Sequence, residues 1–206
     1  MKWIGRLAVC AIFAGGTAAV GAASNENQAE ALLEMMKARD RSIQEIVRSK
    51  TEGQTEAERK RLKEIVGDLF NFRRFSELSL GRYWKERTEE EQTEFTDLCR
   101  RLIQKNYADP KLYAKSDKID YIGAEVNGTD ALVKTVVHYK SEHSTIDYKL
   151  HLVDSKWLIY DMIIDDLRVS RNNRSQFYKE IRKHSYESLV RKLKDKLSSK
   201  SNDGKG

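Results

Sequence analysis

Three neighbouring aspartates, Asp161, Asp165 and Asp166, are the residues of this sequence best spaced for acid–base chemistry. Two carboxyl groups that approach each other can share a proton, which places a general acid beside a general base. Two of the three, however, flank the end of an expected strand, where aspartate is common because its side chain hydrogen-bonds the turn. A structural role in a turn or loop is therefore the favoured interpretation.

The histidines and cysteines do not suggest a catalytic centre either. The four histidines, at positions 138, 143, 151 and 184, lack the His-Glu-x-x-His spacing of a zinc site, and His138 and His151 fall on the polar sides of their strands. Cys99 follows a leucine on an expected helix and has no identifiable histidine partner, which favours a buried structural thiol. We therefore expect no catalytic residue, metal or cofactor. An exported enzyme with a titratable pair in a polar pocket remains an alternative.

The first 23 residues have the layout of a secretory signal peptide. Lys2 and Arg6 precede an apolar run over residues 7–19, and small residues follow at positions 20–23. The run is shorter than the ~18 residues of a membrane-spanning helix and is broken by two glycines, so a retained anchor is the weaker alternative. We expect cleavage after residue 22 or 23 and a soluble exported protein.

Composition describes a single small domain. Removing 23 of the 206 residues leaves 183, with 36 basic and 32 acidic side chains, a net charge of +4. Charges of both signs are interspersed, which is typical of a solvated surface and does not indicate a nucleic-acid partner. Cys99 is then the only cysteine, so no internal disulfide can form. We expect one domain over residues 24–200 and a disordered tail over 201–206.

Hydrophobic periodicity predicts several helices in the first half of the chain. An amphipathic helix is expected over residues 28–47, and a second one follows residues 51–54. A short third helix should end at Gly81. The sequence from Thr88 to Glu91 is a capping box, which predicts the start of a fourth helix that ends before Pro110.

The second half changes to the two-residue period of strands. Asn127-Gly128 predicts a hairpin between strands over 119–126 and 131–139. Residues 144–165 predict two more strands joined at Asp154-Ser155, and one helix is expected over 172–197. This order predicts an α+β domain in which helices pack on a curved antiparallel sheet of about four to five strands and enclose an apolar cavity, as in an NTF2-like or cystatin-like roll.

The last long strand is unusual because it is apolar on both sides. Under strict alternation Leu158, Tyr160, Met162 and Ile164 share one face, and Trp157, Ile159 and Ile163 share the other, interrupted by Asp161. We expect one face to pack under helices and the other to form part of the wall of a cavity.

Two blocks of the sequence resemble a known family. Residues 80–110 begin with Leu80-Gly81-Arg82-Tyr83-Trp84, and the second block runs from Lys156-Trp157 to Arg174-Ser175-Gln176-Phe177. Their order and spacing resemble the MlaC family of periplasmic phospholipid carriers, also known as toluene-tolerance or ABC-transporter auxiliary proteins. The chain departs from the family pattern at Asp166, Arg168 and Asn173, where the family usually has Gly, Ser and Tyr.

The resemblance implies a carrier that shuttles phospholipid between an outer-membrane lipoprotein complex and an inner-membrane ABC transporter complex, with transient membrane contact, and so maintains outer-membrane lipid asymmetry. A periplasmic adaptor that binds a partner without lipid cargo is the alternative. In the adaptor, the basic residues of the C-terminal helix would form the binding surface; in the carrier, they could face the membrane or the transporter. They are Arg182, Lys183, Arg191, Lys192, Lys194 and Lys196.

The expected lipid-binding residues are large apolar and aromatic side chains from the helices and both faces of the strands. They are Phe70, Phe75, Leu80, Trp84, Phe95, Leu98, Leu102, Tyr121, Val133, Val137, Tyr139, Ile146, Tyr148, Leu150, Leu152, Trp157, Ile159, Met162, Ile164 and Phe177. Arg171 and Arg174, with Arg168 as a further candidate, are expected to meet the phosphate of the head group.

Overall fold

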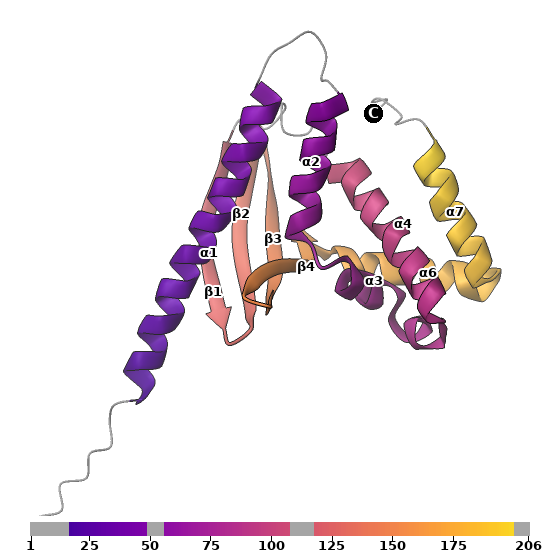
Figure 1. Cartoon of the computed structure of the whole chain (residues 1–206), viewed down its shortest axis with the longest axis horizontal. Coiled ribbons are helices and arrows are strands. Elements are labelled where there is room, and N and C mark those ends of the chain that lie inside the picture. The colour runs from indigo at the N-terminus through magenta and orange to yellow at the C-terminus, as the bar shows by residue number, and fades with distance from the viewer. Residues whose placement is uncertain (1–16, 49–55, 108–117, 200–206) are drawn as a thin grey trace, which may run out of the picture.

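The computed structural model describes residues 17–48, 56–107 and 118–199 (Figure 1). Residues 1–16 of the expected signal peptide, the segment 51–54, Pro110 and the tail 201–206 lie outside the described residues. No helix in the described part of the chain combines the length and the apolar character needed to cross a membrane.

The helical elements precede and follow one block of strands, as an α+β order requires. Their bounds are α1 Thr17–Arg48, α2 Glu56–Leu69, α3 Phe72–Leu80, the 3-10 helix η1 Gly81–Glu86, α4 Glu89–Tyr107, α6 Val169–Lys183 and α7 Tyr186–Ser198. Helix α1 begins eleven residues before its expected start at residue 28. The extension contains four alanines, the residue with the highest helix propensity.

The start of α4 confirms the capping box. The Thr88 N–H donates to Glu91 Oε2 over 2.9 Å, and the Glu91 N–H donates to Thr88 Oγ1 over 3.2 Å. This reciprocal pair satisfies two backbone donors that the helix itself leaves unpaired.

The strands form one five-stranded antiparallel sheet in the order β1-β2-β3-β4-β5. Their bounds are β1 Lys118–Asn127, β2 Asp130–Tyr139, β3 Glu142–Val153, β4 Lys156–Ile164 and β5 Leu167–Arg168. Both expected hairpins are present, and positive φ angles at Gly128, Asp154 and Ser155 shape their turns. Asp165 and Asp166, with φ of 47° and 64°, form a further two-residue turn into β5.

The expected grouping of the β4 side chains by face is wrong, because a β-bulge at Tyr160 breaks the alternation. Asp161 pairs with Lys149 and Ile159 pairs with Leu150, so Tyr160 has no partner in β3. Because of this unpaired residue, the side chains before Tyr160 lie on the face opposite to the one that strict alternation predicts. Trp157 and Ile159 therefore lie on the same face as Met162 and Ile164.

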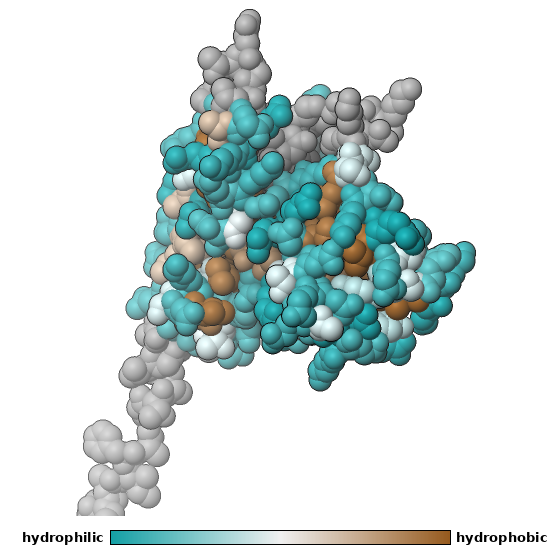
Figure 2. All heavy atoms as spheres, turned by 45° about the vertical axis from the view of Figure 1, so that its right-hand side comes forward, coloured by the Kyte–Doolittle hydropathy of each residue, from teal (hydrophilic) through white to brown (hydrophobic). Residues whose placement is uncertain are grey.

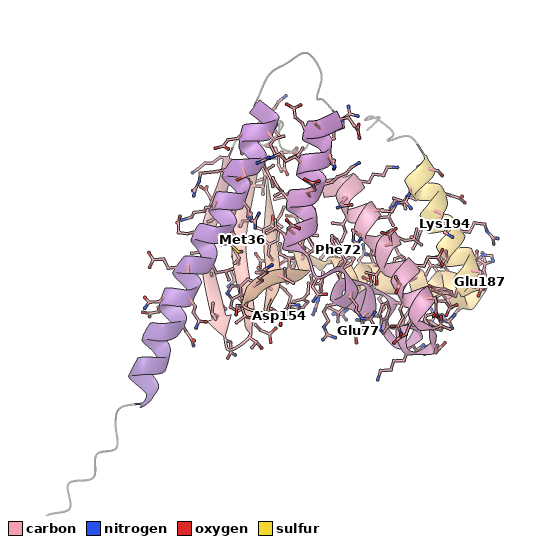
Figure 3. The ribbon with its side chains drawn as sticks, viewed as in Figure 1. Met36, Phe72, Glu77, Asp154, Glu187 and Lys194 are labelled. Atoms are coloured by element: carbon pink, nitrogen blue, oxygen red, sulfur yellow. The ribbon has the colours of Figure 1, made fainter. Side chains whose placement is uncertain are left out.

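This shared face packs into the core beneath the N-terminal helices. Helix α1 runs along β1, where the Tyr121 hydroxyl donates to the carbonyl oxygen of Met36 (Figures 1 and 3). The connection from α2 to α3 covers the edge of β4, with the Asn71 N–H donating to the Ile159 carbonyl over 2.8 Å. Several side chains of this face are nearly or fully buried, namely Val133, Thr135, Leu150, Ile159 and Met162.

The expected single helix over 172–197 is two helices, α6 and α7, which meet at His184-Ser185. The Ser185 side chain accepts a hydrogen bond from the Ser188 N–H over 3.2 Å and so caps the start of α7. The apolar spacing continues through this junction, which hides the break from an analysis of periodicity.

Gly81 lets α6 approach the end of α3 closely. Its φ is 56°, and a Cβ atom there would lie 2.4 Å from the Tyr178 hydroxyl. That hydroxyl accepts a hydrogen bond from the Arg82 N–H over 2.8 Å, and the Arg174 guanidinium donates to the Leu78 carbonyl. These contacts attach the end of α3 and the start of η1 to α6.

Candidate functional site

Asp161 anchors the corner between β4 and α6. Its carboxylate is fully buried and accepts hydrogen bonds from the N–H groups of Ser170 and Met162, both over 3.0 Å. It also accepts from the Arg168 guanidinium and the Ser170 hydroxyl. Asp165 lies apart in the turn, where its carboxylate accepts from the Thr145 N–H over 2.9 Å. Asp161 and Asp165 therefore have separate structural partners.

The contacts of His138 and His151 and the burial of Cys99 also indicate structural roles. His151 lies 2.8 Å from the Asn71 amide, and burial lowers the pKa of this histidine. His138 contacts Asp120 on the outer face of the sheet. Burial raises the pKa of the Cys99 thiol to about 12, so the reactive thiolate is scarce at neutral pH. Within the described ranges, no cluster of three metal-ligating side chains is present.

A cavity of about 660 Å³ opens among α3, α4, α6, α7 and the end of β4. Its volume lies in the range typical of small-molecule sites. Figure 2 shows hydrophobic surface between hydrophilic surfaces in the half of the molecule that carries these helices. The apolar lining consists of Phe75, Cys99, Leu102, Ile103, Ile164, Leu167, Val169, Phe177, Leu189 and Leu193.

Polar side chains complete the lining, and most of them come from α6 and α7. They are Asp165, Asn172, Asn173, Gln176, Glu180, Lys192 and Lys196. Leu167 is 67% exposed although it is a large apolar residue, and it lines the same cavity. An apolar wall beside polar and charged groups is the arrangement that an amphipathic ligand requires.

Four of the twenty expected lipid-binding residues line this cavity, namely Phe75, Leu102, Ile164 and Phe177. Nine others are buried in the core and absent from this lining: Leu80, Trp84, Phe95, Leu98, Val133, Val137, Leu150, Ile159 and Met162. The remaining seven are half-buried, namely Phe70, Tyr121, Tyr139, Ile146, Tyr148, Leu152 and Trp157. A role for these sixteen in lipid binding stays a prediction.

The arginines expected at the head group lie outside the cavity lining. Arg171 is exposed, and Arg174 donates two hydrogen bonds to the Leu78 carbonyl, over 2.8 and 2.6 Å. Arg168 pairs with Asp161. Their contact with a phosphate also stays a prediction, and the cations that line the cavity are Lys192 and Lys196.

The three departures from the family pattern have distinct places in the structure. Asp166 has a φ of 64°, a conformation that glycine adopts freely and aspartate tolerates. Arg168 covers the buried Asp161 carboxylate. Asn173 is the only one of the three that lines the cavity.

Sequence reasoning missed the contribution of α7 to the cavity wall. A signal was present, because Leu189 and Leu193 recur at a spacing of four residues, and Lys192 and Lys196 recur beside them. This pattern predicts a helix with one apolar side next to a basic edge. From the sequence alone the basic edge indicates a docking surface, since nothing in the sequence shows which elements α7 faces.

Comparisons with known proteins give a consistent result. The family model described as MlaC protein matches residues 37–195. A solved structure of the phospholipid-binding protein from Ralstonia solanacearum, in complex with a phospholipid, has a TM-score of 0.66 and 21% sequence identity. The match covers 82% of this chain and 97% of that chain, so the two share a fold. No curated protein matches.

Proposed function

Because this chain belongs to the MlaC family, we propose that it is a periplasmic carrier that holds the acyl chains of a phospholipid in the cavity between α4, α6 and α7. The observation that carries the proposal is the cavity of about 660 Å³ with an apolar wall and a charged lining. The Ralstonia solanacearum protein, which shares the fold, was solved with a phospholipid. Both the cavity of this chain and the phospholipid bound to the similar structure support a site for an apolar ligand.

The energetics of lipid transfer explain why such a cavity is useful. Each methylene group left in water costs about 0.8 kcal/mol, so an acyl chain of roughly 14 to 16 carbons faces a barrier on the order of 10 kcal/mol to crossing water. A protein that encloses the chain removes most of this cost. A polar or charged head group can remain at the lining residues of α6 and α7, where it keeps its contact with water.

We further propose that the protein shuttles phospholipid between an outer-membrane lipoprotein complex and an inner-membrane ABC transporter, and so maintains lipid asymmetry. Family membership and the signal-peptide pattern of the first 23 residues support this role. The structural partners of Asp161 and the raised pKa of Cys99 weigh against the alternative of an exported enzyme.

Native mass spectrometry of the gently purified mature protein tests the carrier function. We expect a stoichiometric adduct of phospholipid mass that disappears on denaturation, and solvent extraction followed by lipid mass spectrometry identifies it. A protein that is free of lipid and also takes none from liposomes would contradict the proposal. The adaptor interpretation would then be favoured.

A further inference from the structure

The polar lining of the cavity carries charges of both signs, in an order set by helix periodicity. On α6, Asn172, Gln176 and Glu180 recur at a spacing of four residues, and on α7 Lys192 and Lys196 do the same. Residues four apart share one face of a helix. Each helix therefore presents a polar stripe to the cavity, amide and acidic on α6 and basic on α7.

Glu180 lines the cavity, and hydrogen bonds hold its carboxylate in place. It accepts hydrogen bonds from the Ser188 hydroxyl over 2.8 Å and from the Lys192 ammonium group. The hydrogen bond from Lys192, more than any other interaction, lowers the pKa of Glu180, so the carboxylate is ionised at neutral pH. The Glu180 side chain is 14% exposed, whereas that of Lys192 is 59% exposed. A carboxylate accepts about four hydrogen bonds, so Glu180 can accept more than these two.

Lys196 is the cation available to a ligand. It lies one helical turn beyond Lys192 on α7 and, among the described residues, forms no ion pair. Asp165 adds a second carboxylate to the lining. The lining thus has two lysines and two carboxylates, which gives no net charge.

We infer that this lining selects a phospholipid whose head group carries both a phosphate and a primary ammonium group, as in phosphatidylethanolamine. Lys196 binds the phosphate and Glu180 binds the ammonium group. Lys192 contacts Glu180 and Lys196 follows Lys192 by one helical turn, so the acceptor and the Lys196 cation are neighbours at the lining, as the short two-carbon spacer of ethanolamine requires. A glycerol head group offers Glu180 only neutral hydroxyl donors and no positive charge, and its net negative charge is unbalanced at a lining of zero net charge. This inference rests on the proposed function.

The test is a competition between two lipids of identical acyl chains. The mature protein is incubated with vesicles that contain equal amounts of phosphatidylethanolamine and phosphatidylglycerol, then separated and extracted for lipid mass spectrometry. We expect the ethanolamine lipid to be enriched about two- to fivefold over its share in the vesicles, the selectivity that a partly exposed ion pair provides. Glu180→Gln should abolish the enrichment, and Glu180→Asp should retain most of it.

Matched controls separate this effect from general charge effects. Glu187→Gln removes a carboxylate from the outer side of α7, away from this cavity (Figure 3), and should leave the enrichment unchanged. Lys196→Gln should reduce retention of both lipids, whereas Arg191→Gln should not. Lipid bound without enrichment, or enrichment that survives Glu180→Gln, would overturn this inference alone. Absence of any bound lipid would overturn the carrier function as well.

Discussion

At the scale of single residues, the buried Asp161 carboxylate accepts hydrogen bonds from backbone and side-chain donors, most of which lie at the start of α6. Its carboxylate is fully buried, and Ser170 contributes two of its four hydrogen-bond donors. Ser170 directly follows Val169, which lines the cavity. The position of Val169 in the cavity wall therefore depends on the Asp161 carboxylate of β4, which does not itself line the cavity.

Asp161→Asn should destabilise the protein by about 2 to 4 kcal/mol, because the amide group faces N–H donors and removes the charge from a buried pair. Urea unfolding of both proteins measures the difference. Asp154→Asn is the control, since Asp154 lies at the exposed β3–β4 turn (Figure 3), where asparagine tolerates the positive φ of 46°. Its effect should stay within about 0.5 kcal/mol. Equal losses in the two variants would contradict the anchoring role.

At the scale of elements, α7 is attached to the domain by contacts at both of its ends. Near its start, the Tyr186 hydroxyl donates to the Glu91 carbonyl over 3.3 Å. At its end, the Lys105 ammonium group of α4 donates to the carbonyls of Lys196, Leu197 and Ser199 over 2.8, 3.3 and 2.6 Å. A cation at this position satisfies the free carbonyl groups of a helix C-terminus and complements the helix dipole.

Lys105→Met should therefore loosen the last turn of α7. We expect amide hydrogen exchange to become about five- to tenfold faster over residues 195–199, because a charge-assisted cap contributes about 1 kcal/mol or more. Arg101→Met is the control, because Arg101 is exposed on the same helix and, within the described residues, its ion pair is with Asp97 on its own helix. Exchange that is unchanged in Lys105→Met would show that apolar packing alone holds the end of α7.

The sequence was informative about elements wherever a local chemical signal exists. Asn127-Gly128 predicted the hairpin, and Thr88 with Glu91 predicted the start of α4. The bulge at Tyr160 was missed because strict alternation assumes that every residue has a cross-strand partner. This single residue places Trp157 and Ile159 on the core face with Met162 and Ile164, of which Ile164 alone lines the cavity. The lining itself depends on contacts between α4, α6 and α7 that periodicity does not show.

At the scale of the whole molecule, most of the sheet lies apart from the cavity, which only Ile164 at the end of β4 and Leu167 of β5 reach. The N-terminal helices α1 and α2 cover the core face of the sheet, and the cavity lies on the side of α4, α6 and α7 (Figures 1 and 2). Substitutions can therefore fill the cavity without disturbing the packing of the strands.

Leu102→Trp should fill part of the cavity and reduce bound phospholipid about fivefold or more, because overpacking of an apolar site costs about 1 to 3 kcal/mol. Leu102 is half-buried and lines the cavity. Native mass spectrometry measures lipid occupancy, and thermal unfolding should show a smaller stabilisation by lipid. Leu132→Trp, on the outer face of the sheet, is the control and should keep full occupancy. Equal occupancy in the two variants would place the lipid elsewhere.

The walls of the cavity come from residues as far apart as Phe75 and Lys196, and α7 is the last described helix of the chain. A ribosome makes this helix after every other wall is complete. A chain that ends before α7 lacks part of the wall, so the cavity is complete only once this helix has docked. Under the proposed carrier function, loading with lipid therefore follows the synthesis of α7.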